Sequence, residues 1–365
     1  MTQRIVSLQV LRFLAASMVA LYHTAYLPQE ITGIMPCAAW RHASSVGAAG
    51  VDIFFVLSGF VIAMTGPLAS SRPSGALFVW RRWSRVAPVY FLVSLPLMIH
   101  AWVHGGLSWD RMAATFLFWP IMGGVVAYPY IEQGWTLCFE MLFYVSVALL
   151  LSNGKLSRNL AIGIGVAATL ISLRLEFETQ ALRFLTNPIL LEFGVGFALA
   201  NTRSQVARAP LLLGVSLLAA GLGTLAVEGV AGVETMAQPQ SVLEGNLLVA
   251  RLVLFGGPAT AIVAGAIICE RKCGGALAGI LAKGGDASYM LYLTHTMTIS
   301  LVATVWICLR ASAPLVLLIP VALASAVTIG VLCHRLIERP VLKDLRRVRF
   351  GPAPIAAASL PGGSP

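Results

Sequence analysis

The sequence carries very little charge for its length. Asp, Glu, Lys and Arg make up 11% of its 365 residues, and hydrophobic residues make up 58%. Soluble domains carry about 25% charged and about 45–50% apolar residues. The composition therefore excludes a water-soluble enzyme, and it excludes disorder except at the ends. A net charge of +10 could suggest nucleic-acid binding. The placement of the basic residues argues for membrane topology instead, so we expect no nucleic-acid partner.

Cysteine motifs and internal repeats are also lacking. The six cysteines form neither a CxxC pair nor a Cys/His cluster with zinc spacing. Most of them lie in apolar runs, where cysteine usually acts as a small hydrophobic residue. We therefore expect no disulfide framework and no metal site. The absence of an apparent repeat weakens the interpretation as a secondary transporter built from duplicated halves.

Long apolar runs fill most of the chain. A hydrocarbon core about 30 Å thick requires about 20 apolar residues per helix. The runs predict an all-α membrane protein, a polytopic bundle of about ten transmembrane helices. The predicted helices cover residues 7–27, 48–67, 87–104, 133–151, 159–175, 186–202, 209–228, 248–269, 288–310 and 313–334. A shorter run, 112–127, contains a proline and a glycine pair and is interpreted as a re-entrant or interfacial segment.

The basic residues indicate an orientation for this bundle. If the N-terminus is cytoplasmic and the loops alternate, most of the 25 Lys and Arg residues fall in cytoplasmic segments. Such enrichment marks cytoplasmic loops, so both termini are expected in the cytoplasm. We divide the chain into a membrane domain, residues 1–345, and a tail, residues 346–365. The tail is basic and then rich in Pro, Gly and Ala, which predicts a flexible end.

Ionisable side chains inside the predicted helices are candidates for function, because each costs about 2.5–3.5 kcal/mol to insert. Arg12 and His23 are eleven residues apart in the first helix, which is about 20° past three full turns. Both side chains should therefore face one side of the helix, about 16 Å apart along its axis. A lone histidine in a membrane helix is more often structural, but this one shares a face with an arginine.

The second predicted helix carries Asp52, Ser58 and Gly59. Asp52 is expected at a depth similar to that of His23, where it could accept a hydrogen bond from the imidazole and fix which nitrogen is the base. It could equally cap the start of the helix. Ser58 and Gly59 are more simply interpreted as small residues that permit close helix packing.

Arginines gather in the segment WRRWSRVAP, which we place in a loop before the third predicted helix. Arg81, Arg82 and Arg85 could serve only as a topology signal that contacts lipid headgroups. Arg82 and Arg85 are three residues apart, however, so one helical turn would set them side by side. Paired guanidinium groups bind phosphate through two parallel hydrogen bonds each.

Two further predicted helices carry candidate residues. Glu140 lies in the fourth helix among aromatic residues, where a carboxylate needs a partner. Trp135 precedes it and could be an ordinary aromatic residue of the membrane interface. Tyr289 and His295 lie in the ninth helix, with His295 expected in its inner half.

The last predicted helix ends in a charged cluster, CHRLIERP. We expect Glu338 to pair with Arg339 there, and Pro340 to end the helix. This cluster is interpreted as structural.

Six segments together resemble one family. They are, in chain order, LRFLAASMVALYH, GVDIFFVLSGFVI, RRWSRVAPVY, GWTLCFEMLFY, SYMLYLTH and IERP. The chain resembles membrane acyltransferases of the acyltransferase-3 type, which include O-acetyltransferases of bacterial exopolysaccharide, O-antigen and peptidoglycan. The resemblance covers residues 5–345. The form WTLxxEMxFY is most similar to the exopolysaccharide-production branch.

The resemblance implies roles for the singled-out residues. The family pattern of arginine, ten residues and histidine falls on Arg12 and His23, which implies that His23 is catalytic. The family RxxR motif falls on Arg82 and Arg85, which implies that they bind the acyl-CoA donor. Gln9 departs from the family, because many members carry an aspartate two to three residues before the arginine.

The family's tryptophan-to-glutamate motif falls on Trp135 and Glu140, which implies a part for Glu140 in catalysis. Glu140 could orient His23 or protonate the leaving thiolate. Arg12 could bind donor phosphate or polarise the thioester carbonyl. The remaining candidates, expected to support substrate binding, are Asp52, Trp135, Tyr289 and His295.

The function implied by the resemblance is acyl transfer in a bacterial inner membrane. Acetyl-CoA or another short acyl-CoA would donate its acyl group to a hydroxyl of a polysaccharide or lipid-linked oligosaccharide. His23 would act as general base or receive the acyl group first. An alternative is a non-catalytic transporter or flippase of a lipid-linked saccharide, whose path the same residues could line. A purely structural scaffold has difficulty explaining Arg12, His23 and Glu140 together.

Overall fold

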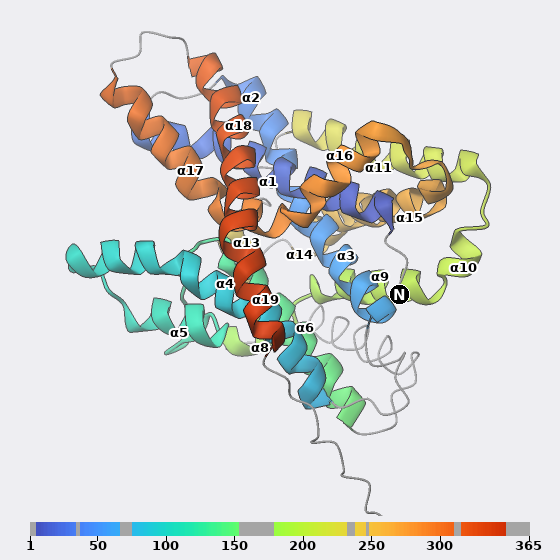
Figure 1. The fold of residues 1–365 in the computed structure, drawn as a ribbon, viewed down its shortest axis with the longest axis horizontal. Coiled ribbons are helices and arrows are strands. Elements are labelled where there is room, and N and C mark those ends of the chain that lie inside the picture. Colours follow the sequence, from blue (N-terminus) through green and yellow to red (C-terminus); the bar gives the residue numbers. More distant parts are fainter. Residues whose placement is uncertain are drawn as a thin grey trace, which may run out of the picture.

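The computed structural model describes residues 5–33, 37–65, 75–152, 179–231, 238–245, 248–309 and 315–347. Over these residues the chain is almost entirely helical (Figure 1), and its one hairpin joins β1 (Ile121–Met122) to β2 (Val125–Val126). Eight helices among the described residues are long and apolar enough to cross a membrane, and a shorter apolar helix covers Gly134–Leu149. The prediction of an all-α polytopic membrane protein is confirmed.

The helices follow the apolar runs closely in the first half of the chain. They are α1 (Val6–Thr32), α2 (Ala38–Ser45), α3 (Ala49–Thr65), α4 (Gly75–Val103), α5 (Trp109–Leu117) and α6 (Gly134–Ser152). One prediction here is wrong, because α4 begins at Gly75 and not near residue 87. The arginine-rich segment is therefore helical and not a loop. Its Trp and Arg residues lower the apolar content without breaking the helix, since none is a strong helix breaker.

The second half of the described chain is more broken. Its helices are α8 (Gln180–Leu185), α9 (Leu190–Asn201), α10 (Arg203–Val206), α11 (Leu211–Ala231), α13 (Pro239–Glu244), α14 (Leu248–Arg251), α15 (Gly257–Cys269), α16 (Gly275–Asp286), α17 (Ser288–Cys308), α18 (Leu315–Cys333) and α19 (Arg339–Arg347). Turns of π-helix at Leu252–Gly256 and His334–Glu338 join α14 to α15 and α18 to α19. The predicted helix 159–175 and most of the tail 346–365 lie outside the described residues.

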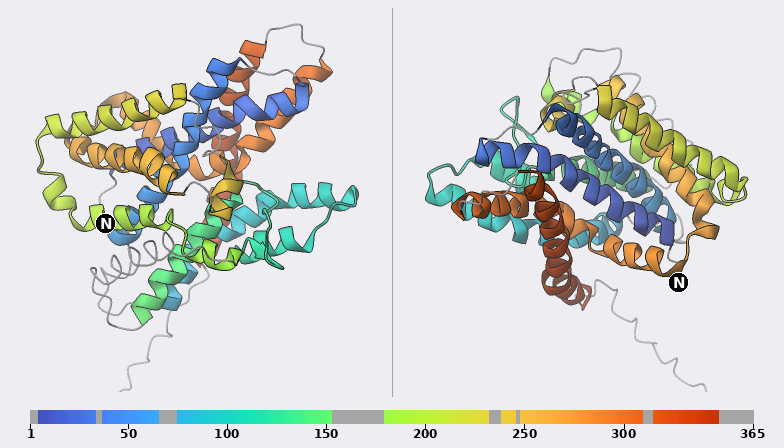
Figure 2. Two further views of the ribbon diagram at one scale, coloured as in Figure 1. Left: turned by 180° about the vertical axis from the view of Figure 1, so that it is seen from behind. Right: turned by 90° about the horizontal axis from the view of Figure 1, so that it is seen from above.

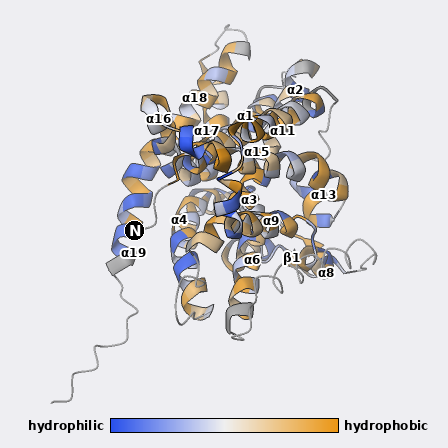
Figure 3. Ribbon diagram, turned by 90° about the vertical axis from the view of Figure 1, so that its right-hand side faces the viewer, coloured by the Kyte–Doolittle hydropathy of each residue, from blue (hydrophilic) through white to orange (hydrophobic). Residues whose placement is uncertain are grey.

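Helix α1 lies among several neighbours and carries two of the candidate residues. It packs against α3, α16, α17 and α18, and the view from above in Figure 2 shows it running across the bundle. Helices α4 and α6 pack against each other and lie below it in Figure 1. Figure 3 shows hydrophilic residues on α19 and on one stretch of α4, while most other helices are apolar.

Glycines allow the closest helix crossing. A Cβ added to Gly196 of α9 would overlap the carbonyl oxygen of Val56 in α3, and one added to Gly59 would overlap that of Phe193. Small residues at a helix–helix contact let two backbones approach. The packing role expected for Gly59 is confirmed. Its neighbour Ser58 instead faces a cavity.

Candidate active site

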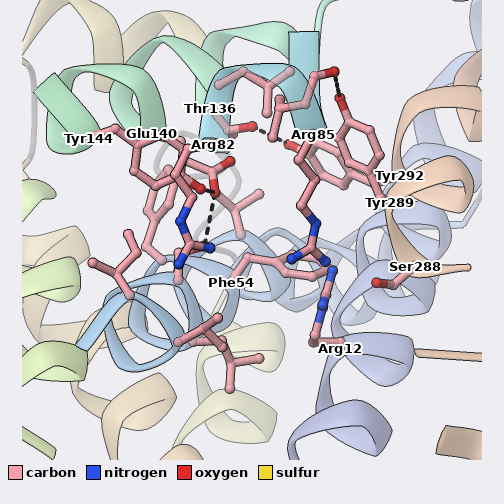
Figure 4. Close-up of a pocket in the computed structure, with 18 of the residues that line it drawn as sticks. Arg12, Phe54, Arg82, Arg85, Thr136, Glu140, Tyr144, Ser288, Tyr289 and Tyr292 are labelled. Atoms are coloured by element: carbon pink, nitrogen blue, oxygen red, sulfur yellow. Dashed lines mark hydrogen bonds between the residues drawn. The ribbon is translucent and has the colours of Figure 1, made fainter. Parts of the chain in front are cut away.

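A cavity of about 120 Å³ lies where α1, α3, α4, α6 and α17 meet (Figure 4). Its polar lining consists of three arginines, two glutamates, three tyrosines and three hydroxyl residues. They are Arg12, Arg82, Arg85, Glu140, Glu338, Tyr144, Tyr289, Tyr292, Ser58, Thr136 and Ser288. Three cations against two carboxylates give this cavity a surplus of positive charge.

The arginines reach the cavity from two helices. Arg82 and Arg85 lie one turn apart on α4, and Arg12 enters from α1, with its guanidinium group beside that of Arg85 (Figure 4). The guanidinium carbon of Arg82 lies 5.9 Å from the ring centroid of Tyr144, which favours a cation near the ring face. Arg81, the preceding residue, is exposed. Three guanidinium groups clustered in one cavity suit an anionic ligand.

Glu140 lies in this cavity and not beside His23. The Ser58 hydroxyl donates to its Oε1 atom across 3.3 Å, and the Tyr144 hydroxyl donates to the same oxygen. Gln133, seven residues earlier, is the residue that contacts the histidines instead, through His295. Seven helical residues correspond to about 10 Å along the axis. Glu140 therefore lies in the cavity that Arg12 also lines, and the expectation that it could orient His23 finds no contact among the described residues to support it.

Glu338 reaches the same cavity from the π-helical turn. Its Oε2 atom lies 2.7 Å from His334 Nδ1, and Arg339 Nε donates to His334 Nε2 across 3.1 Å. The predicted direct pairing of Glu338 with Arg339 is wrong, since His334 lies between them. Pro340 does not end the helix either, because α19 continues from Arg339 to Arg347. The π-turn changes which side chains face inward, so the spacing alone did not reveal Glu338 as a cavity residue.

His23 and His295 form a pair beyond the cavity. Their ring centroids are 4.8 Å apart, and His295 Nε2 lies 3.3 Å from His23 Nδ1. His295 is fully buried and adjoins Tyr292, whose ring centroid is 5.9 Å away. The Tyr292 and Thr136 hydroxyls are hydrogen-bonded across 2.9 Å. Because Tyr292 and Thr136 also line the cavity, they join it to the histidine pair.

Asp52 does not contact His23. Its carboxylate binds Arg251, with Oδ2 2.7 Å from Nη2 and Oδ1 3.2 Å from Nε. Asp52 and Arg251 are almost completely buried, as is Glu192 of α9, whose carboxyl adjoins that of Asp52. The hypothesis that Asp52 orients the His23 ring is therefore wrong. Arg251 lies far away in the sequence, and nothing in the local pattern indicated that it would meet Asp52.

The last two candidates occupy different places. Trp135 is buried in an aromatic cluster with Phe55 and Phe139, outside the cavity lining. Tyr289 lines the cavity and donates its hydroxyl to the Val86 carbonyl oxygen across 2.8 Å. Within the described parts of the chain, no group of three His, Cys, Asp or Glu residues is placed to hold a metal ion.

Comparison with known proteins bears on what this site does. The model of a family described as an acyltransferase domain matches residues 5–335. The chain belongs to the acyltransferase-3 family. It is therefore an acyltransferase, as the resemblance implied. No solved structure matches the chain.

Two curated relatives are similar over most of their length. The exopolysaccharide production protein ExoZ of Rhizobium meliloti (strain 1021) is 32% identical over 333 residues, which cover 87% of this chain and 96% of that protein. The acyltransferase MdmB of Streptomyces mycarofaciens is 26% identical over 397 residues, which cover 98% of this chain and 96% of that protein.

Proposed function

We propose that this acyltransferase moves an acetyl or other short acyl group from cytoplasmic acyl-CoA to a hydroxyl of an exported polysaccharide or its lipid-linked precursor. The protein would act in a bacterial inner membrane with both termini in the cytoplasm. The observation that carries the proposal is the cavity in which Arg12, Arg82 and Arg85 meet Glu140. The name of the relative ExoZ, which refers to exopolysaccharide production, supports a saccharide acceptor.

The donor end of the site follows from charge and size. Coenzyme A is polyanionic, and guanidinium groups bind phosphate oxygens through paired hydrogen bonds. A cavity of about 120 Å³ is too small for the whole donor, so it would hold a phosphate-bearing part while the thioester end extends toward His23. Arg82 and Arg85 would hold phosphate at the cavity mouth, and Ser58 and Tyr144 would keep Glu140 oriented toward the arginines.

The acyl-transfer step belongs at the histidine pair. His23 takes the proton of the acceptor hydroxyl as its O–H bond breaks, and the oxygen attacks the thioester carbonyl. The C–S bond breaks, and the leaving thiolate receives the proton from His23. Arg12 lies about 16 Å from His23 along α1, so it suits donor phosphate and not the reacting carbonyl.

The test uses the full-length protein in nanodiscs with labelled acetyl-CoA and a polysaccharide acceptor. Arg82→Ala and Arg85→Ala should each raise the KM for acyl-CoA by about 10- to 100-fold, because hydrogen bonds to charged groups are worth about 1.5–3 kcal/mol. Arg81→Ala changes an arginine of the same helix that does not line the cavity, so it is the matched control and should behave as wild type. His23→Ala should abolish transfer while donor binding persists.

Three results would contradict the proposal. Full transfer activity in His23→Ala would remove the general base. An unchanged KM for acyl-CoA in both arginine variants, with weaker acceptor binding, would place the saccharide at the arginines. Movement of a lipid-linked saccharide from one leaflet of the vesicle membrane to the other, without acyl transfer, would favour the flippase alternative.

A further inference from the structure

The histidine pair offers a second functional residue besides His23, and the inference drawn from it rests on the proposed acyl transfer. His295 of α17 is fully buried, and its Nε2 atom faces His23 Nδ1 across 3.3 Å. A buried imidazole needs hydrogen-bond partners for both of its nitrogens. The partners of the two rings therefore determine which nitrogens carry protons.

A backbone carbonyl oxygen lies beside the Nδ1 atom of each ring. His23 Nδ1 lies 2.9 Å from the Val19 carbonyl oxygen, and His295 Nδ1 lies 3.2 Å from that of Leu291. A carbonyl oxygen can only accept a hydrogen bond. In this arrangement both Nδ1 atoms donate, at His23 to the Val19 carbonyl and to His295 together, which leaves the Nε2 atom of each neutral ring with a lone pair.

Gln133 supplies a second donor to His295. Its amide nitrogen lies 3.5 Å from His295 Nε2, and its amide oxygen accepts from the Thr296 hydroxyl across 3.4 Å. The Thr296 contact sets the orientation of the amide, so its N–H points to the ring. His295 Nε2 thus accepts from Gln133 and from the His23 Nδ1–H, which it shares with Val19. If His295 Nε2 were protonated, its N–H would face the N–H of Gln133 and the Nδ1–H of His23, and both hydrogen bonds would be lost.

We propose that His295 is a positioning residue that holds His23 as its Nδ1–H tautomer and thereby leaves His23 Nε2 as the catalytic base. When His23 Nε2 takes the proton of the acceptor hydroxyl, the ring becomes an imidazolium whose Nδ1–H stays bonded to Val19 and His295. His295 then stabilises the charged ring as an acceptor without gaining a proton. The later return of the Nε2 proton to the thiolate restores the starting state.

Two substitutions separate this role from a packing role. His295→Gln keeps an acceptor near the position of Nε2, whereas His295→Leu removes it at similar size. The Leu variant should lower kcat by about 100-fold with an unchanged KM for acyl-CoA, within the range typical of general-base catalysis. The Gln variant should recover most of that loss. His104→Leu, in which an exposed histidine directly after α4 is replaced, is the control and should leave kcat unchanged.

A nitrogen NMR measurement reads the tautomer without activity. The full-length protein, labelled with ¹⁵N-histidine in nanodiscs, carries six histidines, and the His23 signals are assigned from their loss in His23→Gln. Wild type should show a protonated Nδ1 and an unprotonated Nε2 at His23, and His295→Leu should show a mixture of tautomers. Thermal unfolding of each variant confirms that it is folded.

The outcomes distinguish the inference from the proposed function. A protonated Nε2 at His23 in the wild type overturns the inference and leaves acyl transfer standing. Equal kcat losses in folded His295→Gln and His295→Leu also overturn it. Full activity in His23→Ala overturns the proposed function, even if the tautomer is as expected. The expected tautomer together with rescue by Gln supports both.

Discussion

Removal of the Arg251 guanidinium should destabilise the protein more than any exposed substitution. Arg251 and Asp52 are 3% and 0% exposed and approach to 2.7 Å, and the carboxyl of Glu192 lies beside that of Asp52. Arg251→Met keeps the length of the side chain but leaves two buried carboxyls without a cation. Breaking a buried ion pair in this way costs about 3–5 kcal/mol, a large share of a typical stability of about 5–15 kcal/mol.

Asp52→Asn provides the graded comparison. Its amide oxygen still accepts from Arg251, and Glu192 remains as a carboxyl near the guanidinium. The loss should therefore be only about 1–2 kcal/mol, the value of weakening one hydrogen-bonded contact. Because Asp52 does not contact His23, the pH profile of acyl transfer by folded Asp52→Asn should match that of wild type.

Denaturant titration of the full chain in detergent, followed by tryptophan fluorescence, measures these losses. Arg271→Met is the matched control, since Arg271 is exposed and donates to the Ala209 carbonyl oxygen at the surface. It should shift the free energy of unfolding by less than about 1 kcal/mol. The reasoning fails if Arg251→Met shifts it no more than this control, or if Asp52→Asn is the more damaging of the two.

Two further predictions concern helix packing and pH. Gly196→Ala should cost about 1–3 kcal/mol, because its Cβ would meet the backbone of Val56. Gly194→Ala, two residues earlier in open space, should be neutral or gain up to about 1 kcal/mol in the same unfolding assay. Glu132 is exposed, so its effect on stability should be small, and its pKa is raised by partial loss of hydration and then by the charge of Glu30. The folded state therefore holds its proton more tightly than the unfolded state, and this contribution is lost as pH rises through the folded pKa. Relative to wild type, Glu132→Gln should accordingly gain thermal stability between pH 4 and pH 8; a difference that stays flat with pH would contradict it.

Local pattern was sufficient to predict the helices and the face shared by Arg12 and His23. The apolar runs predicted the transmembrane helices, and α1 (Val6–Thr32) continues unbroken through both residues. The start of α4 was missed because a helix lined with arginines over a polar cavity has no continuous apolar run. Length and hydropathy identify helices that face lipid more readily than helices that face a charged interior.

Partners across helices could not be predicted from spacing. Asp52 meets Arg251 at a separation of 199 residues, and His23 meets His295 at 272 residues. Such pairs depend on which helices are neighbours and on their axial register, neither of which a single apolar run encodes. The resemblance implied that Glu140 could orient His23, whereas the packing of the helices places Glu140 in the arginine-lined cavity and His23 against His295.

The spacing along α1 separates the arginine-lined cavity from the histidine pair. Arg12 lines the cavity and His23 contacts His295, and eleven helical residues place them on one face about 16 Å apart. A spacing of nine residues would instead turn the histidine to the opposite face. Pro28, which removes one backbone hydrogen bond, lies beyond His23, so the ladder between the two residues is intact. In the proposed reaction the donor must therefore extend along α1 past Thr136 and Tyr292, and α1 sets the length of the arm that can deliver an acyl group to His23.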